Sequence, residues 1–163
     1  MFDPTAYENM KVVVEGAAYD MDLDGLIKVI DRKDIVDLAT LSRWYEITYC
    51  LNHSSEICAK LRLEAKLNQL ATELLQVGIQ KQVGSFVYLS FSWNQEETNY
   101  FEIIKHHWGP NYIYDERRIH SSLQGIQEEI MINFSRFIVE EMIDDLVEMF
   151  YYSVETLKEL NKG

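Results

Sequence analysis

Apolar and polar residues alternate along the N-terminal part of the chain, the period expected of a β-strand with one buried face. Over residues 11–23 an apolar side chain recurs at nearly every second position, with Glu15 as the interruption. Asp24-Gly25 follows, a pair typical of a two-residue hairpin turn. Residues 26–31 are rich in β-branched side chains and suit the return strand. We therefore predict a β-hairpin over residues 11–31.

The same alternation recurs further along the chain. Residues 43–51 and 86–93 each place apolar or aromatic side chains on one side and polar ones on the other, so both are predicted as strands. Residues 100–108 are predicted as the hairpin partner of the second strand, and residues 112–114 as a short additional strand. Residues 34–42 are ambiguous and suit a short helix.

A helix is predicted over residues 55–77. Its apolar positions form a stripe at helical spacing, and Gly78 stands where a helix C-terminal cap belongs. A rival interpretation is a strand over residues 57–67, where apolar residues also alternate. We favour the helix because the stripe is longer: Ala59, Leu63, Leu67, Leu70, Leu74 and Val77.

The C-terminal region has no glycine or proline between Ile126 and Lys162 and is predicted to be helical, with Ser121 or Ser122 as its N-cap. Its apolar stripe changes direction by roughly a third of a turn along the region. Either the helix breaks near Glu140, or it contacts different neighbours along its length.

These elements predict one domain over residues 1–163 of the α+β class. We expect a mostly antiparallel sheet of about five strands, with one central helix and the long C-terminal helical region covering one face.

Charge narrows the classes of partner. The chain has 15 basic and 27 acidic side chains, for a net charge of -12. Such a chain repels phosphate backbones and anionic lipid, so we expect neither nucleic acid nor a membrane as partner. A basic protein or a cation would be attracted, although acidity serving solubility alone is an equally open interpretation.

The two cysteines, Cys50 and Cys58, match no zinc-binding spacing and are too few for a disulfide framework. Reduced structural thiols in a cytoplasmic protein are expected. Residues 1–10 have no basic segment followed by an apolar run, so we expect no signal peptide, and the sequence has no uncharged stretch of membrane-spanning length.

Residues 20–31 suggest a specific chemistry, because alternating aspartates are followed by a glycine and a carboxylate at the twelfth position. This segment resembles the calcium loop of EF-hand proteins, in which carboxylates and one backbone carbonyl surround the ion. The resemblance implies weak calcium binding through Asp20, Asp22, Asp24 and Asp31. The competing interpretation is an acidic β-hairpin that turns at Asp24-Gly25.

An acidic helical face and two surplus aromatic residues form the predicted interaction surface. The carboxylates recur at helical i,i+4 spacing without the Glu-x-x-His pairs of di-metal bundles. Two aromatic residues fall on the sides of their strands opposite the predicted core, where they could line a groove or an interface. The complete set is Glu140, Glu141, Asp144, Asp145, Glu148, Trp44 and Tyr88.

No glycine-rich phosphate loop, Gly-x-Ser-x-Gly or His-Glu-x-x-His motif occurs, and no catalytic residue is assigned. The leading hypothesis is a non-enzymatic, acidic interaction module (an adaptor, inhibitor, immunity or chaperone-like protein) that binds a basic protein. We also expect a homodimer, with the C-terminal helix as its interface. The alternatives are a small-molecule pocket between the sheet and the C-terminal helix, and the calcium loop. An enzyme is left open, since α+β pockets host many chemistries.

Overall fold

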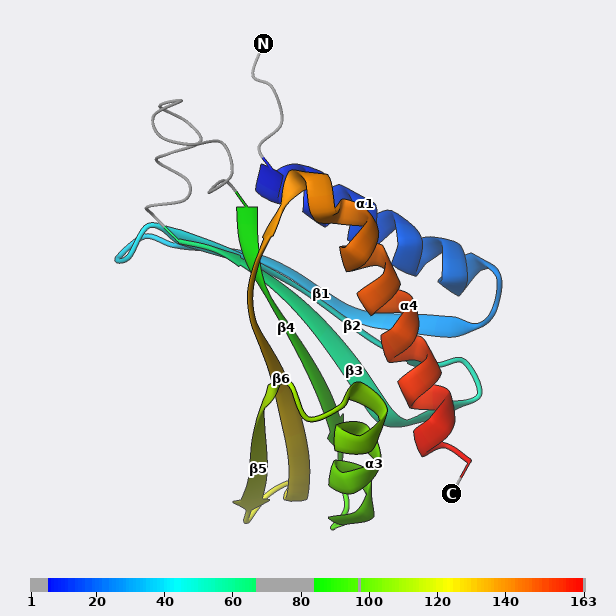
Figure 1. The fold of residues 1–163 in the computed structure, drawn as a ribbon. Coiled ribbons are helices and arrows are strands. Elements are labelled where there is room, and N and C mark those ends of the chain that lie inside the picture. Colours follow the sequence, from blue (N-terminus) through cyan, green and yellow to red (C-terminus); the bar gives the residue numbers. More distant parts are fainter. Residues whose placement is uncertain (1–5, 67–83, 97, 163) are drawn as a thin grey trace.

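The computed structural model describes residues 6–66, 84–96 and 98–162. Within them, a six-stranded antiparallel sheet carries three α-helices on one face, so the predicted α+β class is confirmed (Figure 1). The elements in chain order are α1 (Ala6–Leu23), β1 (Ile27–Asp37), β2 (Ser42–Leu51), β3 (Ser54–Ala65), β4 (Gly84–Trp93), α3 (Thr98–Trp108), β5 (Ile113–Ser121), β6 (Gly125–Val139), the 3₁₀ turn η2 (Glu140–Met142) and α4 (Ile143–Leu160).

The strands follow the order β1-β2-β3-β4-β6-β5, and every neighbouring pair is antiparallel. β1 and β5 therefore form the two edges of the sheet. Along β2, β3, β4 and β6, buried side chains alternate with half-buried ones. The buried set faces the helices, and we call the opposite side the open face, because no element among the described residues packs on it.

The N-terminal hairpin prediction is wrong, because residues 11–23 belong to helix α1. The buried side chains of α1 recur three or four positions apart, including Met10 and Val14, which is the spacing of one helix face. The helix ends in a Schellman motif at Gly25, which has a positive φ of 79°. The Gly25 N–H donates to Asp22 and the Leu26 N–H to Met21, both at 3.0 Å. The Asp24-Gly25 pair thus ends a helix.

Two further predictions assigned the wrong type of element: one predicted helix is a strand, and one predicted strand is a helix. Ser54–Ala65 is a strand, so the rival interpretation is correct for the described part of the predicted 55–77 helix; residues 67–77 lie outside the described residues. The predicted strand at residues 100–108 is helix α3, which ends at Gly109, where φ is 92°. The predicted strands at residues 43–51 and 86–93 are confirmed.

Two predicted helical segments are strands. Residues 34–37 continue β1, and Asp37 Oδ1 then accepts the Ala39 N–H at 2.9 Å in the turn to β2. Residues 125–139 form β6. Ser121, expected to cap a helix, instead accepts backbone N–H groups in the β5–β6 turn. Neither a broken helix nor one continuous helix describes the C-terminal region, because the chain changes from strand β6 to η2 and α4 near Glu140.

The core lies between the sheet and its helices. α4 crosses the middle of the sheet and contacts α1, so the two helices lie side by side on one face (Figure 1). Tyr49 of β2 meets Phe150 of α4 edge-to-face, with ring centroids 5.0 Å apart, and both side chains are fully buried. These two rings fill the space beneath the middle of α4.

Candidate functional site

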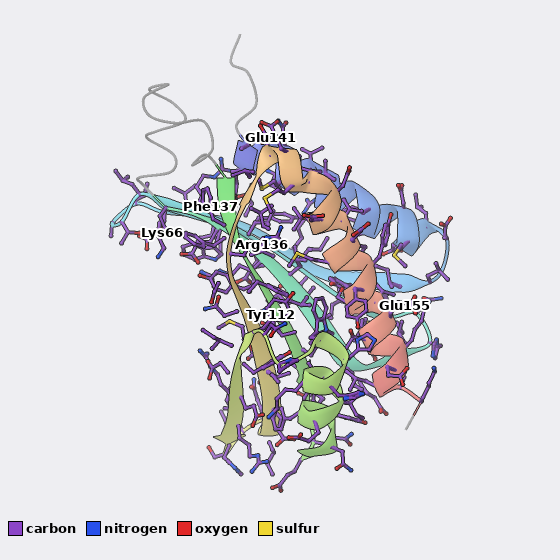
Figure 2. The ribbon with its side chains drawn as sticks, in the orientation of Figure 1. Lys66, Tyr112, Arg136, Phe137, Glu141 and Glu155 are labelled. Carbon is purple, nitrogen blue, oxygen red and sulfur yellow. The ribbon has the colours of Figure 1, made fainter. Side chains whose placement is uncertain are left out.

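The five predicted carboxylates come together where η2 leads into α4. Glu140, Glu141, Asp144, Asp145 and Glu148 are all exposed, and we call them the α4 acidic cluster. Figure 2 shows Glu141 at the end of the helical layer where α1 also begins. The helix N-terminus carries partial positive charge, so the first-turn carboxylates are compatible with a stable helix.

The cluster is only partly neutralised within the chain. Asp145 pairs with Arg136 of β6 at 3.2 Å, and Glu140 accepts a hydrogen bond from Asn9 of α1. Among the described residues, Glu141, Asp144 and Glu148 form no ion pair. These three charges are therefore free to attract a cation from outside.

The negative charge of the chain is concentrated on the helical side. α1 carries four carboxylates against one lysine, and the segment from η2 through α4 carries seven against one. These two segments thus hold a net charge of -9 out of -12. On the open face, Lys60 and Arg62 pair with Glu46, and Arg117 pairs with Asp115. If the acidic side chains served solubility alone, we would expect them to be distributed over both sides of the fold.

A surface hollow of about 430 Å³ adjoins the acidic cluster. Two cluster carboxylates, Asp145 and Glu148, contribute to its lining. Aromatic rings contribute the rest, together with Met149 and Arg136: they are His107, Trp108, Tyr112 and Tyr152. Aromatic faces together with carboxylates attract a cation through the ring quadrupole and direct charge interaction. We call this feature the aromatic–acidic hollow.

Contacts between α3 and α4 hold the aromatic residues in place. His107 stacks on Tyr152 with ring centroids 4.3 Å apart, and Trp108 meets the same ring edge-on at 4.7 Å. Thr156 of α4 lies 2.7 Å from His107 Nδ1 and accepts the Trp108 indole N–H at 3.1 Å. Burial lowers the pKa of His107, so this histidine is neutral at pH 7 and does not repel a cation.

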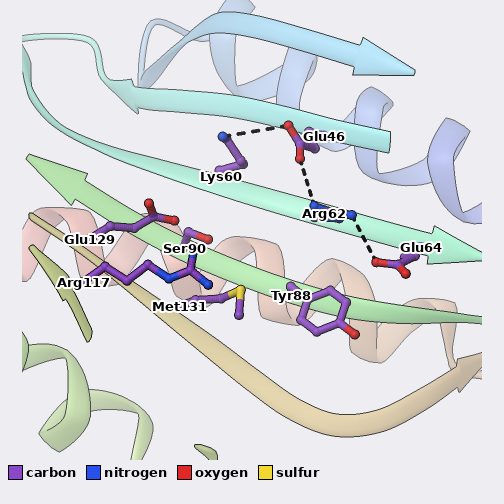
Figure 3. A pocket seen from close by; sticks show the side chains of 9 residues that line it. All are labelled: Glu46, Lys60, Arg62, Glu64, Tyr88, Ser90, Arg117, Glu129 and Met131. Carbon is purple, nitrogen blue, oxygen red and sulfur yellow. Dashed lines mark hydrogen bonds and ion pairs between the residues drawn. The ribbon is translucent and has the colours of Figure 1, made fainter. Parts of the chain in front are cut away.

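Trp44 and Tyr88 do not join the acidic cluster. Both lie on the open face, where the Arg62 guanidinium sits 5.0 Å from the centre of the Trp44 ring. Tyr88 lines a second hollow of about 370 Å³ (Figure 3). Arg62 bridges Glu46 and Glu64 there, at 3.4 and 3.2 Å. The charges of this hollow therefore largely satisfy one another, and the predicted interaction surface divides into two separate regions.

In the calcium-like segment, Asp20 and Asp22 lie near the end of α1, Asp24 lies in the turn that follows, and Asp31 lies in β1. Asp22 Oδ2 accepts the Val29 N–H at 2.9 Å and so ties the helix end to β1. Asp31 pairs with Lys33 on the edge strand. The described residues contain no group of three or more histidine, cysteine or carboxylate side chains placed to hold a metal ion.

An ion-pair network joins α1 to the edge of the sheet. Asp34 of β1 accepts from Lys11 at 2.7 Å and from Arg43 at 3.2 Å, and Arg43 also bonds Glu8 at 2.6 Å. Burial by itself would raise the pKa of Asp34, but the two cations outweigh it and hold that pKa below its usual value. The Asp34 carboxylate is therefore ionised in the folded protein down to low pH.

The two cysteines are unbridged and face each other across β2 and β3. Burial raises the pKa of the Cys58 thiol to about 11, and it also raises the pKa of Cys50. Because the thiolate is the nucleophile, neither group is activated at neutral pH.

Sequence reasoning missed the aromatic–acidic hollow. The sequence predicts a strand at Trp108, and Tyr152 is not among the predicted site residues. The available signal was the basic and aromatic end of residues 105–108 directly before Gly109, which is typical of a helix C-terminus.

Comparison of this chain finds no match among protein-family models, curated proteins or solved structures. In the part of the chain that the structure describes, no helix is both long enough and apolar enough to cross a membrane.

Proposed function

We propose that this protein is a non-enzymatic interaction module that binds a basic protein segment on its helical side. The supporting observation is the aromatic–acidic hollow beside the α4 acidic cluster. There a lysine or arginine side chain would meet aromatic rings and carboxylates together, while further cations of the segment would meet Glu141 and Asp144.

The separation of charge between the two sides supports the same function. A field concentrated on one side orients a basic partner before contact and raises its association rate. Exposed charges are screened over about 8 Å at physiological salt, so this attraction weakens as salt increases. Binding should therefore be fast at low salt and should weaken steadily with ionic strength.

The test uses a fluorescent nona-lysine peptide and measures its affinity by anisotropy over a salt series. The helical-side variant is Glu141→Gln, Asp144→Asn and Glu148→Gln, which removes the three unpaired carboxylates and leaves Arg136 with its partner. We expect this variant to bind about tenfold more weakly at low salt, since each exposed charge contributes about 0.5 kcal/mol.

The matched control removes the same number of charges outside the helices, with Asp24→Asn, Glu56→Gln and Glu129→Gln. Among the described residues these three carboxylates also form no ion pair, and none is buried. The control should keep nearly the affinity of the wild type. If both triple variants lose affinity equally, only net charge matters and the proposal fails; it also fails if the wild type does not bind the peptide.

A further inference from the structure

The outer edge of β5 has a pattern of side chains that complements a second copy of itself. β5 is the last strand of the sheet and pairs only with β6 among the described strands. Its ladder with β6 runs without a bulge from Ile113 to Ser121. A long, regular edge strand with unpaired backbone groups is a template for another strand.

Apolar and charged side chains alternate along this edge and remain accessible. Ile113 and Ile119 are 62% and 46% exposed although both are large and apolar. Between them lie Asp115 and Arg117, whose side chains are 45% and 57% exposed. These four residues share the open face, because successive strand residues point to opposite sides.

Symmetry restricts how two copies of β5 could pair. Two identical antiparallel strands in one sheet are related by a two-fold axis normal to that sheet, and this rotation keeps each face on its own side. Each residue then lies opposite a residue whose side chain points to the same face. The two-fold axis must therefore pass midway between one residue and the same residue of the partner. Direct opposition places the two side chains in contact on one face.

One such register matches every pair on the open face. With the axis at Glu116, Ile113 opposes the partner's Ile119, and Asp115 opposes the partner's Arg117. Each pair occurs twice because of the symmetry. Moving the axis to Arg117 would instead place Asp115 opposite an isoleucine and bring two Arg117 side chains together.

The other face of the strand also fits this register. Tyr114 opposes the partner's Arg118, a pairing of an aromatic ring with a guanidinium. Arg118 is held in place by Glu128 of its own chain at 2.6 Å. The two Glu116 side chains meet on the axis, where each is already paired with Lys105 of its own chain, so their charges are balanced.

We propose that β5 pairs antiparallel with β5 of a second copy, with Glu116 on the two-fold axis, so that the sheet continues from one chain into the other. The expected interface on the C-terminal helix is less favourable, because a symmetric contact there would bring two α4 acidic clusters together. The β5 contact uses backbone groups along the outer edge of the sheet, whereas the proposed basic segment would bind side chains on the helical side, so neither contact requires the other (Figure 1).

Charge exchange tests the pairing, with mass in solution measured by light scattering after size exclusion. Asp115→Lys and Arg117→Glu should each be monomeric, because each places like charges opposite one another twice. An equimolar mixture of the two variants should be dimeric, since both opposing pairs again become complementary. The wild type and the double variant Asp115→Lys/Arg117→Glu should be dimeric as well.

The proposal is overturned if the wild type is monomeric at every concentration, if both single variants stay dimeric, or if their mixture stays monomeric. Circular dichroism confirms that each variant is folded. As an independent test, Glu116→Cys should form a disulfide-linked dimer on mild oxidation, because directly opposed strand residues have Cα atoms within disulfide range. His120→Cys and the wild-type chain are the controls, and equal cross-linking in them would refute the register.

Discussion

The hydrogen bond between Tyr49 and Ser153 gives an asymmetric prediction about the interface of α4 with the sheet. The two hydroxyl oxygens lie 2.5 Å apart, and both residues are fully buried. Ser153 also donates to the Phe150 carbonyl at 2.5 Å. Tyr49 is therefore the donor and Ser153 the acceptor. Burial raises the pKa of Tyr49 far above its usual value, so its proton is retained.

The two single substitutions remove the same bond but leave different groups behind. Tyr49→Phe removes the donor, while Ser153 keeps its bond to the Phe150 carbonyl, so the free energy of unfolding should fall by about 1 kcal/mol. Ser153→Ala leaves the Tyr49 hydroxyl buried with no acceptor, which should cost about 2–3 kcal/mol. The double variant leaves no unpaired hydroxyl and should be more stable than Ser153→Ala alone.

Urea unfolding followed by tyrosine and tryptophan fluorescence and by circular dichroism measures all four proteins. The double-mutant cycle then isolates the coupling between the two side chains. The reasoning is refuted if Ser153→Ala is no more destabilising than Tyr49→Phe, or if the two effects simply add. Either result would mean that water, or another group, reaches the Tyr49 hydroxyl.

Three further outcomes test other parts of the structure. Gly25→Ala should lower the free energy of unfolding by about 1 kcal/mol because of its positive φ, whereas Gly16→Ala, in open space within α1, should raise it by about 0.5 kcal/mol; a Gly25→Ala variant as stable as the wild type would contradict the Schellman assignment. The pKa of Asp34 is lower in the folded protein than in the unfolded chain, so its contribution to stability is present above the unfolded pKa and is lost as pH falls. Acid should therefore destabilise the wild type more than Asp34→Asn between about pH 5 and pH 2. Equal dependence of stability on pH in the two proteins would contradict this. Asp22→Ala should lower the melting temperature because it removes the acceptor of the Val29 N–H, and calcium calorimetry on both proteins tests the loop: heat from the wild type alone supports a site, and heat from neither means that the aspartates serve only the helix end.

The fold class and two central strands followed directly from the sequence. In β2 and β4 one side is buried and the other faces solvent, so the alternation of apolar and polar residues indicates a strand. The acidic cluster was also predictable, because charge is a property of composition and i,i+4 spacing places its members together on a helix. The aromatic part of the site was not, since Trp108 and Tyr152 come from helices distant in sequence.

The two strands that were predicted to be helical, β3 and β6, share one physical cause of error: a spacing of four residues fits both periods. Ile126, Ile130 and Phe134 lie on one side of a helix, and they also lie on one side of a strand, because four is a multiple of two. The residues between these positions distinguish a strand from a helix only through their tertiary contacts. Ile132 is buried against the helices, and Glu128 accepts the Trp93 indole N–H at 2.9 Å.

The sequence by itself determined the α+β class, the charge and the helical character of the last segment, because these depend on composition and on short-range spacing. Only the tertiary structure decided that residues 11–23 are a helix, that residues 125–139 are a strand, and which faces meet. Local preference separates helix from strand by a fraction of a kcal/mol per residue, whereas burial of one large apolar side chain contributes about 2 kcal/mol. Whether a segment forms a helix or a strand therefore depends on the residues against which it packs in the folded chain.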